Sequence, residues 1–221
     1  MIEDFHIDLI QMMENAGRNL AHLARERFLS GDPRGRRVHV LAGTGGNGGG
    51  AMVCARRLHC WGADVLIVVA AEDAKFSPVT AHQLDIARRM GISVGEPDTL
   101  TVAGVDLIID GLIGYSLNGK PRGAVADIIR WVNRQSIPVL ALDVPSGIDA
   151  DTGAVYDPAI VATATMTLAL PKEGLMAPSM AASIGELYLA DISVPPGLYA
   201  ASPLSLDIGP LFARGEILRL S

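Results

Sequence analysis

Four segments of the sequence place glycine or proline beside polar side chains directly after an apolar run, an arrangement that can bind and transform a ligand. They are residues 42–50 (AGTGGNGGG), 108–120 (IIDGLIGYSLNGK), 142–149 (LDVPSGID) and 168–174 (LALPKEG). Open α/β sheets bind ligands outside the carboxyl ends of their strands. If each apolar run is a strand of one sheet, the four segments meet at one edge. The sequence therefore predicts one composite site rather than four separate turns.

The first segment contains a glycine pattern typical of nucleotide-binding loops. Gly43, Gly45 and Gly48 satisfy G-x-G-x-x-G between a β-like run and a helical pattern, which favours a phosphate or pyrophosphate at the helix N-terminus. The next apolar run leads to Glu72 and Asp73, roughly where a ribose-binding acid falls in dinucleotide-binding folds. The missing G-K-[ST] ending excludes a standard P-loop. A glycine-rich turn without a ligand stays an alternative, and the pattern alone does not separate an oxidoreductase from other nucleotide-binding proteins.

Side-chain oxygens from three of these segments form a candidate cation site. Asn47, Asp110 and Ser146 offer oxygen ligands without nitrogen or sulfur partners, so they suit a hard cation better than a transition metal. Only one of the three is a carboxylate, which favours a monovalent ion over calcium. The alternative is that Asn47 and Asp110 cap neighbouring helices or turns.

Asp143 and Lys172 are the candidates for proton transfer. Asp143 follows a fully apolar run, and a carboxylate at such a strand end is a candidate general acid or base, with turn capping as the alternative. Lys120 and Lys172 lie in loops bounded by glycine and proline, where an ammonium group can reach a phosphate or assist proton transfer. Ser146 follows a proline and lacks the G-x-S-x-G pattern, so a serine hydrolase is not expected.

The elements that position these segments alternate between strands and helices. Apolar spacing predicts an N-terminal helix within residues 1–30. Strands are expected at residues 36–43, 63–71, 105–114, 137–147, 163–171 and 185–192. Further helices are expected at residues 47–62, 77–91 and 123–136. This alternation predicts an α/β fold, a Rossmann-like three-layer αβα sandwich with a mostly parallel central sheet. We expect a single domain spanning 1–221, with its core at 37–195, the strand at 185–192 finishing the sheet, and the tail at 196–221 wrapping the surface or packing on a neighbouring molecule.

Composition and charge exclude several classes of partner. The net charge is −6 and no cluster of lysine and arginine marks a nucleic-acid surface. No apolar stretch has membrane-spanning length. Cys54 and Cys60 are six residues apart in an expected helix, so they would point to different faces and form no disulfide. The acidic start lacks the basic region of a signal peptide. We therefore expect a cytoplasmic protein that binds neither nucleic acid nor a membrane.

Taken together, these segments resemble the YjeF N-terminal domain family, the NAD(P)H-hydrate epimerases. The resemblance runs from about residue 8 to residue 195, with its blocks in family order. The blocks are LIQMMENAGRNLA, AGTGGNGGGAMVCARRL, IIDGLIGYSLNGKPRG, ALDVPSGIDADTG and TMTLALPKEGL. The family implies a Rossmann-like sheet that binds hydrated nicotinamide dinucleotides, commonly as a homodimer and with K⁺. Its members interconvert the epimers at the hydrated C6 of the ring, so that a partner dehydratase can restore the cofactor.

Carried over residue by residue, the resemblance implies a role for each matching position. Asn47, Asp110 and Ser146 match the potassium ligands, while Asp143 matches a substrate-contacting acid and is, with Lys172, the catalytic candidate. The substrate-binding positions implied are Gly45, Gly46, Asn47, Gly48, Gly49, Gly50, Gly114, Tyr115, Ser116, Leu117, Asn118, Gly119, Lys120 and Asp143. The implied substrate is hydrated NADH or NADPH, and the implied functional partner is a separate NAD(P)H-hydrate dehydratase, since no such second domain follows here.

Two departures from the family pattern keep other functions open. Gly46 stands where the family usually has asparagine, and Gly50 where it usually has aspartate. Both changes remove polar contacts from the expected substrate loop, so a catalytically silent nucleotide-binding or scaffold module is one alternative. An NAD(P)-binding oxidoreductase is the other, although no Tyr-x-x-x-Lys pair or similar proton relay accompanies the loop.

Overall fold

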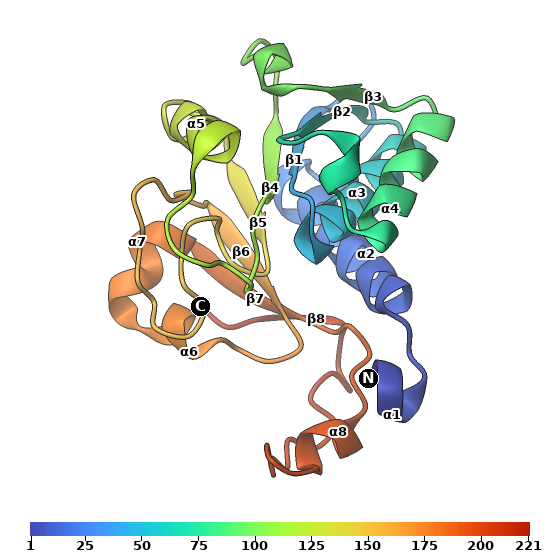
Figure 1. Cartoon of the computed structure of the whole chain (residues 1–221), viewed down its shortest axis with the longest axis vertical. Coiled ribbons are helices and arrows are strands. Elements are labelled where there is room, and N and C mark those ends of the chain that lie inside the picture. The colour runs from blue at the N-terminus through green and yellow to red at the C-terminus, as the bar shows by residue number, and fades with distance from the viewer.

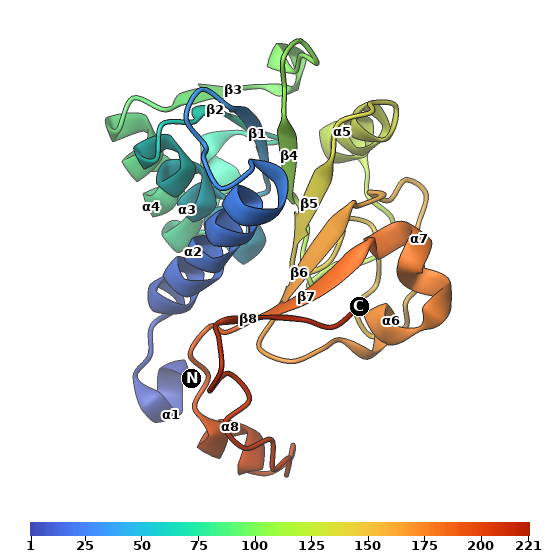
Figure 2. The ribbon, with the colours of Figure 1, turned by 180° about the vertical axis from the view of Figure 1, so that it is seen from behind.

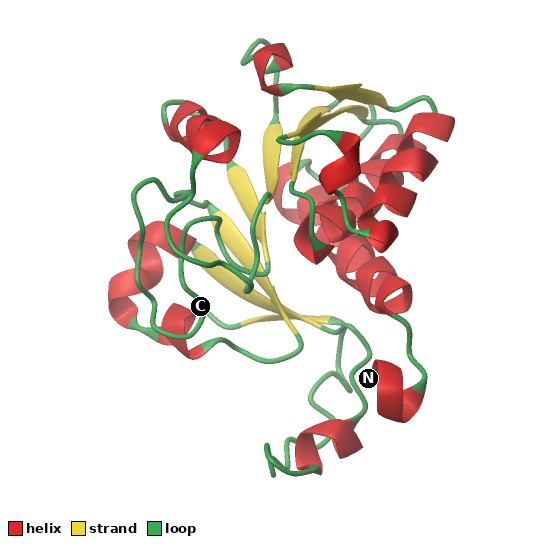
Figure 3. Cartoon of the chain, viewed as in Figure 1, coloured by secondary structure: helices red, strands yellow, loops and turns green.

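The apolar runs of the sequence form one eight-stranded sheet in the computed structural model, which describes all residues from 1 to 221. The strands are β1 (Arg37–Ala42), β2 (Asp64–Val69), β3 (Ser93–Gly95), β4 (Leu107–Gly111), β5 (Val139–Leu142), β6 (Ala164–Leu168), β7 (Glu186–Ala190) and β8 (Ile217–Arg219). The α-helices are α1 (Ile2–Phe5), α2 (Leu9–Phe28), α3 (Gly46–Cys60), α4 (Pro78–Arg89), α5 (Gly123–Asn133), α6 (Glu173–Met176), α7 (Ala181–Ile184) and α8 (Pro196–Ala200). Figure 3 shows how the strands form the centre of the molecule between the helices.

The strand order places a ligand crevice between β1 and β4. The order is β3-β2-β1-β4-β5-β6-β7-β8, with every neighbouring pair parallel except β7 and β8. From β1 the chain winds outward to β3, then returns to β4 and winds in the other direction. Ligands of open α/β sheets bind at this reversal point, outside the carboxyl ends of the strands.

Helices cover both faces of the sheet, which confirms the predicted three-layer fold. Figures 1 and 2 show α2, α3 and α4 on one face and α5, α6 and α7 on the other. Alternate side chains of each strand enter opposite cores, so Val40 packs with the α2–α3 side and Leu41 with the α5 side. Because both faces are covered, the central strands are continuously apolar, and Leu107, Ile108 and Ile109 of β4 are fully buried.

The end of the sheet differs from the sequence prediction. The expectation that residues 185–192 finish the sheet is wrong, because Ile217–Arg219 adds β8 antiparallel to β7. The three-residue β3 was not predicted either. Neither segment carries an apolar run long enough to indicate a strand, and each pairs with only one neighbour. Between β7 and β8 the tail forms α8, which lies beside α1 in both views (Figures 1 and 2).

None of the helices combines the length and apolarity needed to cross a membrane.

The close crossing of α2 and α3 depends on Gly17. A Cβ atom at this position would overlap the Gly50 carbonyl oxygen and the Val53 side chain. Since α2 forms a wall of the site described below, this crossing also fixes the distance between that wall and the glycine loop.

We expect Gly17→Ala to lower the free energy of unfolding by at least about 2 kcal/mol, because the added methyl group forces two helices apart. Urea denaturation measures the change. Gly46→Ala is the matched control, since a Cβ atom there meets nothing within 4 Å and alanine is the better helix former. Equal stability of the two variants would contradict the tight crossing.

Candidate active site

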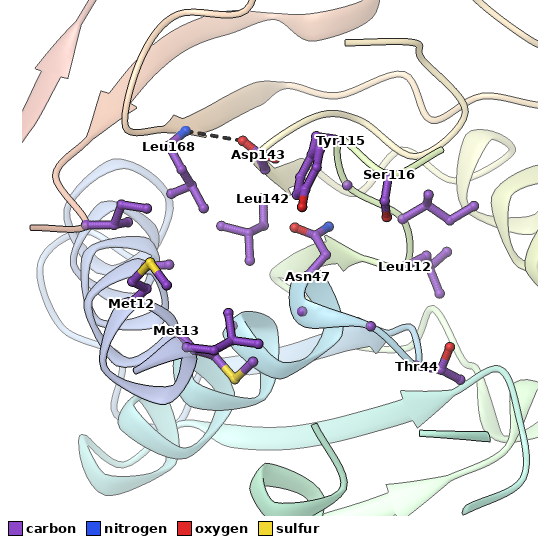
Figure 4. Close-up of a pocket in the computed structure, with 18 residues that line it drawn as sticks. Met12, Met13, Thr44, Asn47, Leu112, Tyr115, Ser116, Leu142, Asp143 and Leu168 are labelled. Carbon is purple, nitrogen blue, oxygen red and sulfur yellow. Dashed lines mark hydrogen bonds between the residues drawn. The ribbon is translucent and has the colours of Figure 1, made fainter. Parts of the chain in front are cut away.

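A cavity of about 540 Å³ opens at the carboxyl ends of β1, β4 and β5, where the topology predicts a ligand crevice. Its wall contains Leu9, Met12, Met13, Ala16, Thr44, Gly45, Gly46, Asn47, Gly50, Leu112, Ile113, Gly114, Tyr115, Ser116, Leu142, Asp143, Leu168 and Ile192. Figure 4 shows Asp143, Tyr115 and Asn47 on one side of the cavity and Met12 and Met13 of α2 on the other. The cavity therefore has a polar side and an apolar side.

The glycine loop presents bare backbone N–H groups to this cavity. Gly45 is the N-cap of α3, and the N–H groups of Gly46 and Asn47, two residues of the cavity wall, have no acceptor within the chain. Such groups, together with the helix dipole, make a helix N-terminus favourable for an anion. At Gly48 a Cβ atom would overlap the Gly43 carbonyl, so the tight turn needs glycine there. Gly46 instead faces open space, which shows that its glycine is not required by packing.

Position 50 is more restricted than position 46. A Cβ atom at Gly50 would lie 2.9 Å from Cδ2 of Leu142. A side chain at this position would therefore require the Leu142 side chain of β5 to shift.

A tight turn directs the Asp143 carboxylate into the site. Asp143 has a left-handed φ of 65°, and the Val144 N–H donates to the Leu142 carbonyl at 2.8 Å. These features describe a γ-turn, a strained geometry that aspartate tolerates better than most residues. The side chain is 95% buried, yet the residue lines the cavity.

The two oxygens of Asp143 have different surroundings. Oδ1 accepts from the Thr167 hydroxyl at 3.4 Å and the Leu168 N–H at 3.3 Å, and it lies 2.7 Å from Nζ of Lys172. Oδ2 has no hydrogen-bond partner within the chain. The carboxylate is thus held by one oxygen and free to act on a ligand with the other.

A second strained turn positions Lys172. Ala169 has a φ of 67°, and the Leu170 N–H donates to the Leu168 carbonyl at 2.8 Å. That carbonyl also accepts from Nζ of Lys172 at 2.7 Å. The turn at the end of β6 therefore aims a carbonyl at the lysine and holds its ammonium group against Asp143.

Asp110 and Ser146 join the loops that follow β4 and β5. Oδ2 of Asp110 accepts from the Ser146 N–H at 2.8 Å, and Oδ1 accepts from the Ser146 hydroxyl at 2.6 Å and from the Leu112 N–H at 3.2 Å. The Ser146 hydroxyl oxygen also accepts from the Ile113 N–H at 2.9 Å. Burial raises the pKa of Asp110 to about 6, although the hydrogen bonds from Ser146 and Leu112 oppose the shift. No lysine, arginine or histidine balances this carboxylate.

Asn47 lies next to this pair of loops. Its side-chain oxygen would be 3.0 Å from a Cβ atom at Gly114, and its backbone oxygen 3.3 Å from one at Gly111, the residue after Asp110. The side-chain nitrogen is buried without a partner. Rotation of the amide by 180° would place its oxygen there instead.

The structure brings nearly half of the predicted site residues to one cavity. Eight of them line the cavity: Gly45, Gly46, Asn47, Gly50, Gly114, Tyr115, Ser116 and Asp143. Lys172 does not line the cavity but forms an ion pair with Asp143, which does. Gly48 and Gly49 lie behind the wall, packed against Gly43 and Met13, and Leu117, Asn118, Gly119 and Lys120 do not line it. Lining a cavity does not test ligand binding, so substrate contact stays a prediction for all of the substrate-binding positions.

The apolar wall contributed by α2 was not assigned to the site from the sequence. Met13 and Ala16 belong to the apolar helical stripe visible in the sequence, but such a stripe is typical of any buried helix face. Leu9, 42% exposed, and Met12 also line the cavity. Only the packing of α2 beside the glycine loop distinguishes this stripe from an ordinary core face.

Comparisons with known proteins agree with the geometry. Residues 9–174 match the family model described as YjeF-related protein N-terminus. The chain is 42% identical to an NAD(P)H-hydrate epimerase of Dehalogenimonas lykanthroporepellens, over 97% of this chain and 84% of that protein. It is 39% identical to an NAD(P)H-hydrate epimerase of Levilactobacillus brevis, over 74% of each. It also matches 38% of the length of a bifunctional NAD(P)H-hydrate repair enzyme of Moorella thermoacetica, with 34% identity over 89% of this chain.

A solved structure shares the fold. The crystal structure of yeast YNL200c superimposes with a TM-score of 0.79, covering 99% of this chain and 94% of that chain at 23% identity. At that identity the likeness supports the architecture alone.

We expect Ala169→Gly to raise the free energy of unfolding by about 0.5–1 kcal/mol. A left-handed φ costs alanine about 1–2 kcal/mol, of which the greater flexibility of unfolded glycine offsets only part. Chemical denaturation measures the difference. The matched control is Ala182→Gly in α7, an exposed helical position where glycine destabilises by about 1 kcal/mol. A loss of stability in both variants would show that the turn at Ala169 is unstrained.

Proposed function

We propose that this chain, which belongs to the family of YjeF-related N-terminal domains, epimerises hydrated nicotinamide dinucleotides at C6 of the nicotinamide-derived ring. The observation that carries the proposal is the free oxygen of Asp143, held beside Lys172 and facing a cavity bounded by bare N–H groups of α3. Relatives named NAD(P)H-hydrate epimerase support the same substrate class.

Different parts of the cavity suit the pyrophosphate and the nicotinamide-derived ring of such a substrate. The pyrophosphate suits the N-terminus of α3, where Gly46 and Asn47 offer N–H groups and no side chain blocks approach at Gly46. The ring suits the space between Asp143 and the apolar wall of Leu142 and Met13. This orientation brings C6 toward the only carboxylate that lines the cavity.

Inversion at C6 requires an acid and a base on the same ring carbon. In one route the C6 hydroxyl leaves as water after protonation, the ring nitrogen lone pair forms an iminium bond, and water adds to the other face. In the other route a base removes the hydroxyl proton, the C6–N1 bond breaks with proton transfer to N1, and the ring closes on the opposite face. Asp143 can accept and return the proton in either route through Oδ2.

Lys172 keeps Asp143 in position for this role. Its ammonium group lies between Oδ1 of Asp143 and the Leu168 carbonyl. The side chain is 20% exposed, so it is also within reach of water near the cavity and can supply a proton. Removing one partner of such a shielded pair is costly.

The residues around Asp110 fit a potassium ion. Asp110 is fully buried, lacks a positive partner and would be largely ionised at neutral pH with a pKa of about 6. Ser146 and Asn47 add neutral oxygens, and the protein has no cluster of three or more His, Cys, Asp or Glu side chains that would suit a transition metal. We propose that Asn47, Asp110 and Ser146 hold K⁺, which when bound would neutralise the buried carboxylate beside the cavity.

Three further predictions from the family resemblance accompany this function. A separate NAD(P)H-hydrate dehydratase would consume one epimer. A homodimer and a cytoplasmic location are expected as well, and each stays a prediction.

We expect the purified protein to equilibrate one epimer of hydrated NADH with the other faster than buffer does, as resolved by liquid chromatography. Asp143→Asn should lower the rate by about 100- to 10,000-fold, the range of general acid–base contributions. Asparagine tolerates the left-handed turn, so folding and dinucleotide binding should be retained. Wild-type rates in Asp143→Asn would remove Asp143 from the mechanism, and no acceleration by the wild type would favour a silent binding module.

We expect K⁺ to stabilise the fold through the Asp110 site. At ten times the dissociation constant the gain is about 1.4 kcal/mol, or roughly 3–6 °C in melting temperature for a chain of this size. Thermal melts in KCl, LiCl and choline chloride at equal ionic strength measure it. Ser146→Ala should remove the difference between salts, and an equal melting temperature of the wild type in all three would contradict a potassium site.

A further inference from the structure

Tyr115 occupies an unusual position for a large aromatic side chain. It is 74% exposed, yet it lines the cavity. It is also the only aromatic residue in the cavity wall. Figure 4 shows its side chain on the same side of the cavity as Asp143 and Asn47, with Met12 and Met13 on the opposite side.

The backbone before Tyr115 is fixed. Gly114 is buried, and a Cβ atom there would lie 3.0 Å from the Asn47 side chain. The preceding residue, Ile113, donates its N–H to the Ser146 hydroxyl at 2.9 Å. Tyr115 therefore extends from an anchored point of the chain, and its largely exposed side chain lines the cavity with little protein packed against it.

We infer that the ring of Tyr115 covers the outer face of the nicotinamide-derived ring, so that Tyr115 sets substrate affinity through its aromatic face. This inference rests on the proposed function for the identity of the ligand. Next to the ring nitrogen, the hydrated ring retains a planar segment that includes the carboxamide. A tyrosine face packs well on such a planar segment, and its negative quadrupole favours the partial positive charge on the ring nitrogen. The apolar residues Leu142 and Met13 would then contact the inner face.

The position of Asp143 decides which ring of the dinucleotide is covered. Asp143 and Tyr115 line the same cavity and lie on the same side of it, so a ring that reacts with Asp143 is the one that Tyr115 is placed to cover. The adenine ring lies at the far end of the molecule, beyond the pyrophosphate. The hydroxyl of Tyr115 has no hydrogen-bond partner in the chain and is not needed for this role.

Tyr115→Phe and Tyr115→Ala separate the aromatic face from the hydroxyl. We expect Tyr115→Phe to bind hydrated NADH within about twofold of the wild type. Tyr115→Ala should bind it about 5- to 10-fold more weakly, in the upper part of the range for aromatic pairs. Isothermal titration calorimetry measures both. Val161→Ala is the matched control, because Val161 is 56% exposed and precedes β6 at the opposite edge of the sheet.

ADP-ribose, which lacks the nicotinamide-derived ring, identifies the covered part of the ligand. Its affinity should be the same for the wild type and Tyr115→Ala. An equal loss for ADP-ribose and hydrated NADH would overturn the inference, as would unchanged binding of hydrated NADH by Tyr115→Ala. A loss of binding in Tyr115→Phe as large as in Tyr115→Ala would assign the effect to the hydroxyl and also overturn it.

These titrations remain informative if the chain binds hydrated NADH without epimerising it. In that case the proposed function fails, while the comparison of Phe and Ala at position 115 still decides whether the aromatic face contributes. Melting temperatures equal to the wild type confirm that both variants fold, as expected for so exposed a side chain.

Discussion

The site depends on one buried carboxylate that joins two loops of the sheet edge. Asp110, at the end of β4, accepts hydrogen bonds from Ser146 in the loop after β5 and from Leu112 in its own loop. Ser146 in turn accepts from Ile113. These bonds hold the segment before Tyr115 against the segment after Asp143, so the two loops on the polar side of the cavity keep their spacing. Since an ionised carboxylate in an apolar interior is costly without a compensating charge, the same carboxylate is the centre of the proposed potassium site.

Much of the fold was predictable because its signals are local. Parallel strands covered on both faces are predominantly apolar. Strands β1, β2, β4 and β5 appear in the sequence as runs of this kind, and β6 alternates apolar residues with threonine. Glycine and proline mark the strand ends, and Ser77 and Pro78 mark the start of α4. The meeting of four loops at one edge follows from the topology alone. That is why the sequence alone predicts that Asn47, Asp143 and the residues around Gly114 lie at one edge, where they line one cavity.

The remaining features depend on contacts between distant parts of the chain. The sequences at residues 142–144 (LDV) and 168–170 (LAL) do not indicate the strained turns at Asp143 and Ala169. These turns persist because neighbouring strands hold them. The contribution of Met12 to the cavity requires α2 to cross α3 at Gly17, and a helical stripe does not reveal its partner. Strand β8 forms only because β7 offers a free edge, since three residues carry no strand pattern of their own. Exposure of Tyr115 likewise follows from the path of its loop.

The central claim is that C6 of a hydrated nicotinamide ring reacts at the free oxygen of Asp143. A crystal structure of the wild-type protein with hydrated NADH tests this claim most directly. We predict that the C6 hydroxyl lies within hydrogen-bonding distance of Oδ2 of Asp143, about 2.6–3.2 Å, with the pyrophosphate at the N–H groups of Gly46 and Asn47. A dinucleotide bound with its nicotinamide-derived ring outside the cavity, or with Asp143 contacting only a ribose, would contradict the account.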